Sequence, residues 1–261
     1  MMVERAVPGE AEWAMLSAPH VARYLAAGEY AAGCRVLDAG SGAGYGASLL
    51  KAAGAAEVLG VDLDRETVRQ AQARFGEASV EFVVDDCEEL GRVIGPFELI
   101  CCFEAIEHLT HPERFLRRAG QLLTEDGALM VSTPDRASTP PFVDGRPRNR
   151  FHVFEWYRQE FQNMLAAHFS EVEMRVQVES PALRSRLEAV QALREGLMWS
   201  NPLLTFVWRK WPFSQKPDRS WTKLAGLAAP TITDYPIVRP AVVAAYGKPC
   251  FNVAICRRPI K

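Results

Sequence analysis

Two carboxylates and an imidazole follow the apolar run at residues 99–102: Glu104, Glu107 and His108, in the stretch FEAIEHL. If a helix begins there, spacings of three and four residues place all three side chains on one face of its first turn. Groups of these types could activate a hydroxyl as a general base or hold a divalent cation. They could also do no more than complement the positive end of a helix dipole.

His152 is a fourth candidate, because a proline- and glycine-rich loop after a predicted strand would return it to the same edge of the sheet. Glu104, Glu107, His108 and His152 would then form a mixed oxygen and nitrogen cluster that suits a divalent metal such as Mg²⁺ or Mn²⁺. We predict that His108, His152 and Glu107 are catalytic, through a general base or a metal, with a structural role as the third alternative. The remaining histidines are interpreted as structural or turn residues: His20, His111 and His168.

Short apolar runs alternate with helical patterns along most of the chain. The runs predict strands at 34–39, 57–62, 80–84, 97–102, 128–133, 171–178 and 250–256. The helical patterns predict helices at 11–28, 45–53, 64–75, 112–123 and 157–168. This alternation predicts an α/β fold, a Rossmann-like, doubly wound and mostly parallel sheet of seven strands with helices on both faces.

The chain is predicted to form one domain in four parts: a helical cap at 1–33, a core at 34–178, an insertion at 180–235 and a final strand within 236–261. Ser180-Pro181 is a typical helix start at the beginning of the insertion. From residue 181 to 223 there are eight Lys or Arg against three Asp or Glu, and four tryptophans follow residue 198. We therefore predict that the insertion is a lid over the acceptor site.

The first predicted strand leads into a glycine-rich loop, VLDAGSGAGYGA, at residues 36–47. Gly40, Gly42 and Gly44 allow a tight turn and a close approach of the backbone to a ligand. The helix that follows offers free N–H groups at its start. Tyr45 occupies the sixth position of the dinucleotide pattern G-x-G-x-x-G, which disfavours a dehydrogenase.

Acidic residues end three successive predicted strands: Asp38, Asp62 and Asp86. A carboxylate at Asp62 can accept both hydroxyls of a ribose. Asp38 suits a ligand that carries an amino group, and Asp86 is placed to take the amino group of an adenine. These residues could also be ordinary polar strand ends, but with the glycine loop they predict a nucleoside-type cofactor site.

The loop, GVDLD, VVDDCEEL, FELICCFEAIEHL and LLTEDGALMVSTP together resemble the class I S-adenosylmethionine-dependent methyltransferases, from about residue 20 to 178. The resemblance implies S-adenosyl-L-methionine as cofactor. It places the methionine end at Asp38 and the glycines, the ribose at Asp62 and the adenine at Asp86. The full set of cofactor-binding residues that it implies is Asp38, Gly40, Gly42, Gly44, Asp62, Leu63, Asp86, Cys87, Phe103 and Glu104.

Two further segments narrow the resemblance. NRFHVFEWYRQEF at 149–161 and CFNVAIC at 250–256 are similar to bacterial methyltransferases of surface-polysaccharide and natural-product sugar pathways, which implies O-methylation of a saccharide or glycosylated small molecule. EAIEH and HVFEW also resemble metal-dependent methyltransferases that modify the terminal ribose of small RNAs. An RNA 2′-O-methyltransferase is therefore one alternative, and a non-catalytic cofactor-binding protein is another.

Composition agrees with a cytoplasmic enzyme of small molecules. The net charge of −2 gives no reason to expect a polyanionic partner. The six cysteines include no C-x-x-C pair, which fits a reducing compartment. The N-terminal stretch MMVERAVPGEAEW lacks the apolar core of a signal peptide, and no apolar run is long enough to span a bilayer. The oligomeric state stays open.

Overall fold

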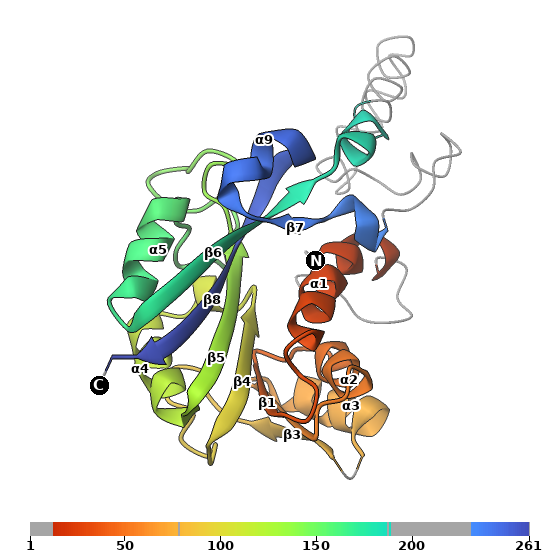
Figure 1. Cartoon of the computed structure of the whole chain (residues 1–261), viewed down its shortest axis with the longest axis vertical. Coiled ribbons are helices and arrows are strands. Elements are labelled where there is room, and N and C mark those ends of the chain that lie inside the picture. The colour runs from red at the N-terminus through yellow and green to blue at the C-terminus, as the bar shows by residue number, and fades with distance from the viewer. Residues whose placement is uncertain (1–12, 78, 187, 189–230, 261) are drawn as a thin grey trace.

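The computed structural model describes residues 13–77, 79–186, 188 and 231–260, and Figure 1 shows how its elements are arranged. All seven predicted strands and all five predicted helices are confirmed, with shifts at their ends that are largest at the start of β5. In chain order the elements are α1 (Trp13–Gly28), β1 (Arg35–Ala39), α2 (Tyr45–Ala52), β2 (Glu57–Asp62), α3 (Arg65–Phe75), β3 (Val80–Val84), β4 (Phe97–Phe103), η1 (Ile106–His108), α4 (Pro112–Leu122), β5 (Leu123–Pro134), α5 (Arg158–Ala166), β6 (Phe169–Glu179), η2 (Ile232–Asp234), β7 (Ile237–Val238), η3 (Pro240–Val242), α9 (Val243–Tyr246) and β8 (Lys248–Pro259).

The strands form one sheet in the order β3-β2-β1-β4-β5-β8-β6-β7. Neighbours from β3 to β5 pair in parallel, whereas β8 is antiparallel to both β5 and β6. The eighth strand, β7, pairs with the edge of β6 and has only two residues, too few to show an apolar pattern in the sequence. The strand order reverses between β1 and β4, and open α/β sheets bind ligands in the crevice at such a point.

The central strand β4 shows why the apolar runs predicted this sheet. Its sequence FELICCF is buried at every position except Glu98, because neighbouring strands and helices cover both faces. Alternate side chains reach opposite faces, with Ile100 and Cys102 on one and Leu99 and Cys101 on the other. Each fully buried large aliphatic side chain contributes about 1.5–3 kcal/mol to folding.

Helices cover the sheet on both sides, as predicted. On one face, α4 and α5 bury Phe115, Leu116, Phe161 and Leu165 against the strands. On the other face lie α1, α2 and α3, and Figure 1 shows these two groups on opposite sides of the sheet. No helix within the described residues is both long and apolar enough to cross a membrane.

The helix start predicted at Ser180-Pro181 is confirmed. Ser180 Oγ accepts a hydrogen bond from Leu183 N (3.2 Å), and Pro181 is the first residue of a helical turn at 181–186. Residues 189–230, with the four tryptophans, lie outside the described residues. The acceptor lid therefore stays a prediction.

Candidate active site

The glycine loop between β1 and α2 turns as its sequence predicts. Gly40 has a φ of 79°, and a Cβ there would lie 2.5 Å from the Cβ of Ala105, so a larger residue would push away the chain that follows β4. Gly42 also has a positive φ, 52°, but nothing lies within 4 Å of a Cβ placed there. The loop is thus packed at Gly40 and open at Gly42, where a ligand can approach the backbone.

Asp38 is a fully buried carboxylate at the end of β1. Its Oδ1 accepts a hydrogen bond from the Tyr24 hydroxyl (2.9 Å), while its Oδ2 has no hydrogen-bond partner among the described residues. Burial raises the pKa of Asp38 to about 7, and nearby Asp62 adds to the rise, although the Tyr24 hydrogen bond opposes it. A cation at Oδ2 would lower this pKa, which suits the ammonium group of an amino-acid ligand.

Asp62, at the end of β2, connects the glycine loop to the next strand. Its Oδ2 accepts a hydrogen bond from Gly42 N (3.1 Å), and its Oδ1 accepts one from Asp64 N (2.9 Å). Each carboxylate oxygen can accept a second hydrogen bond, so these contacts orient the carboxylate and still leave it able to bind a ribose.

The predicted adenine end lies beside β3. Asp86 Oδ1 accepts a hydrogen bond from Glu88 N (2.9 Å), which holds the loop after β3 in a turn. Cys87 is buried in the core, and burial raises the pKa of its thiol to about 12, so it carries no negative charge at neutral pH. Leu63 is 69% exposed, and its apolar side chain beside Asp62 can pack on a flat base.

Glu104 departs from the prediction. It has a φ of 52°, a backbone conformation that a first helical turn does not allow, and the short helix η1 begins only at Ile106. Its carboxylate forms an ion pair with Arg23 of α1 and contacts His20 of the same helix, at 2.8 Å from His20 Nε2 to Glu104 Oε1. Burial lowers the pKa of His20 well below its usual value, so this imidazole is neutral. The prediction that Glu104 joins the metal cluster is therefore wrong, since its side chain is held by α1.

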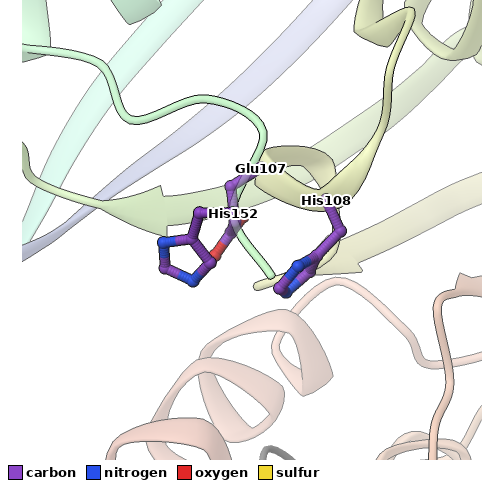
Figure 2. Close-up of side chains that lie close together, drawn as sticks. All are labelled: Glu107, His108 and His152. Atoms are coloured by element: carbon purple, nitrogen blue, oxygen red, sulfur yellow. The ribbon is translucent and has the colours of Figure 1, made fainter. Parts of the chain in front are cut away.

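The other three predicted residues do converge. Ligand atoms of Glu107, His108 and His152 all lie within 4.8 Å of one another, and Figure 2 shows the side chains gathered from two separate segments. The backbone explains how His152 arrives there. Val153 N and Phe154 N both donate hydrogen bonds to the Glu107 carbonyl, at 2.8 and 3.2 Å, so the loop before α5 docks on η1.

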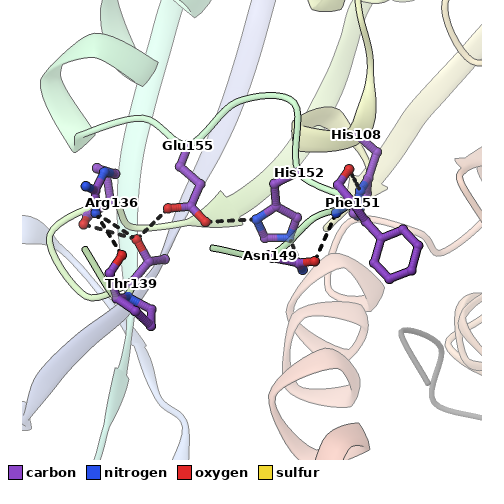
Figure 3. Close-up of polar contacts among 8 residues, drawn as sticks. His108, Arg136, Thr139, Asn149, Phe151, His152 and Glu155 are labelled. Carbon is purple, nitrogen blue, oxygen red and sulfur yellow. Dashed lines mark hydrogen bonds and ion pairs between the residues drawn. The ribbon is translucent and has the colours of Figure 1, made fainter. Parts of the chain in front are cut away.

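Hydrogen bonds fix the orientation of both imidazoles (Figure 3). His108 Nδ1 lies 2.9 Å from the Phe151 carbonyl, and His152 Nδ1 lies 3.0 Å from Glu155 Oε1. Because a carbonyl or carboxylate oxygen only accepts, each Nδ1 carries the proton, and in the neutral ring the lone pair is then on Nε2. Metal-binding histidines are held in this way, with the second nitrogen donating to a carboxylate or carbonyl.

The support for His152 continues beyond Glu155. The Thr139 hydroxyl donates to Glu155 Oε2 (2.5 Å), and Arg136 Nη1 donates to the Thr139 hydroxyl (3.2 Å), as Figure 3 shows. On the other side of the ring, Asn149 Nδ2 donates a hydrogen bond to His152 Nε2 (2.8 Å), so its amide lies where a metal ion bound to Nε2 would be. The ring of His152 is therefore positioned by a chain of polar groups from the loop between β5 and α5.

Glu107 is completely buried beneath the two imidazoles. Burial raises its pKa to about 8, although the Thr133 hydroxyl and the charge of Arg23 act in the opposite direction. A buried carboxylate beside two oriented imidazoles is an unfavourable place for a negative charge unless a cation accompanies it. Two nitrogen ligands and one oxygen ligand fit a transition-metal ion such as Mn²⁺ better than the predicted alternative Mg²⁺, which prefers oxygen ligands, and they leave further positions for an acceptor or water.

Comparisons with known proteins agree with this geometry. Residues 15–188 match the family described as a methyltransferase domain. A probable S-adenosylmethionine-dependent methyltransferase of Mycolicibacterium smegmatis is 34% identical over 170 residues, and one of Mycobacterium tuberculosis is 37% identical over 150. The chain belongs to the class I S-adenosylmethionine-dependent methyltransferases.

The match to the Mycolicibacterium protein covers 65% of this methyltransferase and 65% of that relative. The match to the Mycobacterium protein covers 57% of this chain and 53% of that relative. A ubiquinone biosynthesis O-methyltransferase of Xanthomonas oryzae is 34% identical over 116 residues, which are 43% of this chain and 48% of that protein. These matches show the family and leave the acceptor open.

Solved structures confirm the methyltransferase fold. An S-adenosylmethionine-dependent methyltransferase of Mesorhizobium loti matches with a TM-score of 0.52 at 18% identity, over 96% of this chain and 99% of that one. The [4+2]-cyclase SpnF matches with a TM-score of 0.57 at 18% identity, over 93% and 82%. Since one of these neighbours is named as a cyclase, the fold alone does not define the reaction.

The methyltransferase site also contains residues that the sequence did not single out. Arg23 and Tyr24 of α1 contact Glu104 and Asp38, and His20, interpreted above as structural, pairs with Glu104. Arg23 is wholly buried, bonds to Gln177 of β6 and stacks 4.3 Å from the ring centre of Phe251. An arginine inside the mostly apolar pattern of α1 was the available signal.

Proposed function

We propose that this methyltransferase transfers the methyl group of S-adenosylmethionine to a hydroxyl of a saccharide or a glycosylated small molecule. The resemblance of residues 149–161 and 250–256 to sugar-pathway methyltransferases supports the acceptor class. The name of the Xanthomonas relative, an O-methyltransferase, supports transfer to oxygen.

The observation that carries the proposal is the set Glu107, His108 and His152, with both imidazoles held through Nδ1. A sugar hydroxyl is a poor nucleophile at neutral pH and needs a base or a cation that lowers its pKa. An amine acceptor needs only to lose a proton, so a set of this kind would be superfluous for N-methylation.

We assign the three side chains as ligands of a divalent cation. When bound there, the cation lowers the pKa of an acceptor hydroxyl. Glu155 and the Phe151 carbonyl keep His152 and His108 in the tautomer with the lone pair on Nε2, and a cation at His152 would displace the Asn149 amide from that nitrogen. In the transfer, the acceptor oxygen bonds to the methyl carbon as the sulfur–carbon bond breaks, S-adenosylhomocysteine leaves with the bonding electron pair, and the hydroxyl proton passes to solvent.

Other residues position the cofactor for this displacement. Asp38 and Asp62, oriented by hydrogen bonds from Tyr24 and Gly42, would hold its amino-acid and ribose parts beside the glycine loop. Glu104, which contacts Arg23 and His20, joins α1 to the end of β4. In-line attack depends on such fixed placement of both partners.

One feature supports a second candidate, an RNA 2′-O-methyltransferase. Arg146, Arg148 and Arg150 are exposed and alternate with less exposed residues in the segment that leads to His152. Arg150 also lies 4.6 Å from the ring centre of Phe151. Arginines beside an aromatic ring can bind a phosphate backbone and a stacked base.

The test is release of S-adenosylhomocysteine with free sugars, glycosides, nucleotide-linked sugars, phenols and a short RNA with a free terminal ribose. We expect turnover with a saccharide, loss of it with a chelator, and recovery with Mn²⁺ or Mg²⁺. Turnover with RNA alone supports the second candidate. Full turnover in the presence of chelator would contradict the metal site and favour His108 or His152 as a general base. Binding of the cofactor without any turnover would contradict the proposal that the protein is an enzyme.

A further inference from the structure

Tyr24 lies outside the cofactor motifs but contacts the first residue of the cofactor site. It belongs to α1, is 3% exposed, and donates a hydrogen bond from its hydroxyl to Asp38 Oδ1 (2.9 Å). Both partners are buried, so this bond is shielded from water and strongly oriented. Tyr24 therefore acts on Asp38 from a helix that the glycine loop does not include.

Three elements hold the Tyr24 ring in place. It packs edge-on against Phe103 at the end of β4 and against Tyr45 at the start of α2, with ring centres 5.0 and 5.9 Å apart. A Cβ at Gly46 would lie 2.0 Å from Tyr24 Cζ, so the side chain of Tyr24 occupies the space that any larger residue at 46 would need. The absence of a side chain at Gly46 is thus explained by Tyr24.

The hydrogen bond from Tyr24 occupies Oδ1 of Asp38 and leaves Oδ2 for a ligand. Burial, together with the charge of Asp38, raises the pKa of Tyr24 well above its ordinary value, so its hydroxyl keeps its proton and donates. Oδ2 of Asp38 is buried and lacks a hydrogen-bond partner among the described residues. The titratable groups that face Asp38 from the surrounding elements are Tyr24, Tyr45, Asp62, Cys87, Cys101 and Cys102.

We propose that Tyr24 is a positioning residue for the amino-acid end of S-adenosylmethionine. By occupying Oδ1, it fixes the carboxylate so that Oδ2 receives the ligand's ammonium group. The inference rests on the proposed cofactor site at Asp38. It makes α1 part of that site, although α1 precedes the motifs.

Calorimetry with two ligands tests the proposal. S-adenosylhomocysteine carries the amino-acid end, whereas 5′-methylthioadenosine has the same nucleoside and lacks it. Tyr24→Phe removes the hydroxyl and keeps the ring. We expect it to raise the Kd for S-adenosylhomocysteine about tenfold and to leave that for 5′-methylthioadenosine within about twofold. Tyr30→Phe, at a 37% exposed tyrosine, is the matched control and should change neither.

The pH profile separates positioning from general loosening of the fold. Removing the hydroxyl also removes a contact that lowers the pKa of Asp38, so the fall of S-adenosylhomocysteine affinity in acid should begin at a higher pH. 3-Fluorotyrosine at position 24 has nearly the same shape as tyrosine and is a stronger hydrogen-bond donor. With it, the fall of S-adenosylhomocysteine affinity should begin at a lower pH than in wild type. If Tyr24→Phe does not fold, the fluorotyrosine protein alone tests the proposal through this shift in pH.

The outcomes distinguish two failures. If wild type binds neither ligand, the cofactor site itself is wrong. If wild type binds both and Tyr24→Phe weakens both equally, or weakens neither, the cofactor site stands and the role of Tyr24 is overturned. An unchanged pH profile in the fluorotyrosine protein also counts against it.

Discussion

The proposed active site has two halves, one for the cofactor and one for the acceptor, and they are built in different ways. The cofactor half uses residues at the ends of β1 and β2 and a loop that follows at once, with Asp62 hydrogen-bonded to Gly42. The acceptor half joins Glu107 and His108 to His152, which lies 44 residues after His108 and is held by a docked loop. The first half depends on local backbone geometry and the second on long-range contacts. Mutations should therefore affect them separately.

The largest effect is expected at the centre of the acceptor half. Glu107→Gln keeps the size of a fully buried side chain but removes the carboxylate that would bind the cation. We expect methyl transfer to fall at least about 100-fold, with the Kd for S-adenosylhomocysteine within a few fold of wild type. Turnover and calorimetry on the same sample measure both. Glu113→Gln, at a side chain with 47% exposure, is the control and should behave as wild type.

A mutation in the cofactor half should weaken cofactor binding and leave metal binding unchanged. Asp62→Ala leaves Gly42 N and Asp64 N without their acceptor and removes the predicted ribose ligand. The Kd for S-adenosylhomocysteine should rise about 10- to 100-fold, as hydrogen bonds to a charged group contribute about 1.5–3 kcal/mol. Binding of Mn²⁺ should not change. If both ligands are lost together in a folded protein, the two halves are not independent.

The sequence predicted the local geometry around Asp38 and Asp62 better than that around Glu104 for a physical reason. Strand ends, turns and the positions of Asp38 and Asp62 follow from residues close in the chain. The error at Glu104 arose because its backbone has a positive φ and its partners are on α1, about 80 residues earlier. No local pattern contains that contact.

The convergence of His152 with His108 was predicted from the returning loop, but the fixed tautomers were not. They depend on the Phe151 carbonyl and on Glu155, and only the folded loop brings these atoms to the rings. The eighth strand and the role of α1 likewise depend on contacts between distant segments.

A substitution at Glu155 tests whether its hydrogen bond with His152 contributes to metal binding in the acceptor half. Glu155→Gln retains a hydrogen-bond acceptor for His152 Nδ1 but removes the negative charge beside it. Loss of such a supporting carboxylate lowers metal affinity about tenfold, so the effect should be smaller than that of Glu107→Gln. A Mn²⁺ titration measures it, with Glu160→Gln as a control at an exposed position of α5. No change in Mn²⁺ affinity would contradict the support assigned to Glu155.

Lowering the pH should weaken cofactor binding, because Asp38 becomes protonated. Its pKa is raised to about 7, so the ligand-free protein takes up a proton there as the pH falls below 7. A ligand ammonium binds the charged carboxylate, and the affinity for S-adenosylhomocysteine should drop by up to about tenfold per pH unit below that point. Asp38→Asn should bind weakly with no such dependence. A wild-type affinity that is constant from pH 8 to 5.5 would contradict the assignment.

Mn²⁺ binding by the chelator-stripped protein, followed by electron paramagnetic resonance, tests the central claim most directly. His108 and His111 lie three residues apart, but only His108 belongs to the cluster, whereas His111 Nδ1 lies 3.4 Å from the exposed Glu113 carboxylate. We predict one bound Mn²⁺ in wild type and in His111→Ala, and its loss in His108→Ala. Absence of binding in wild type, or equal binding in both variants, would contradict the proposed metal site.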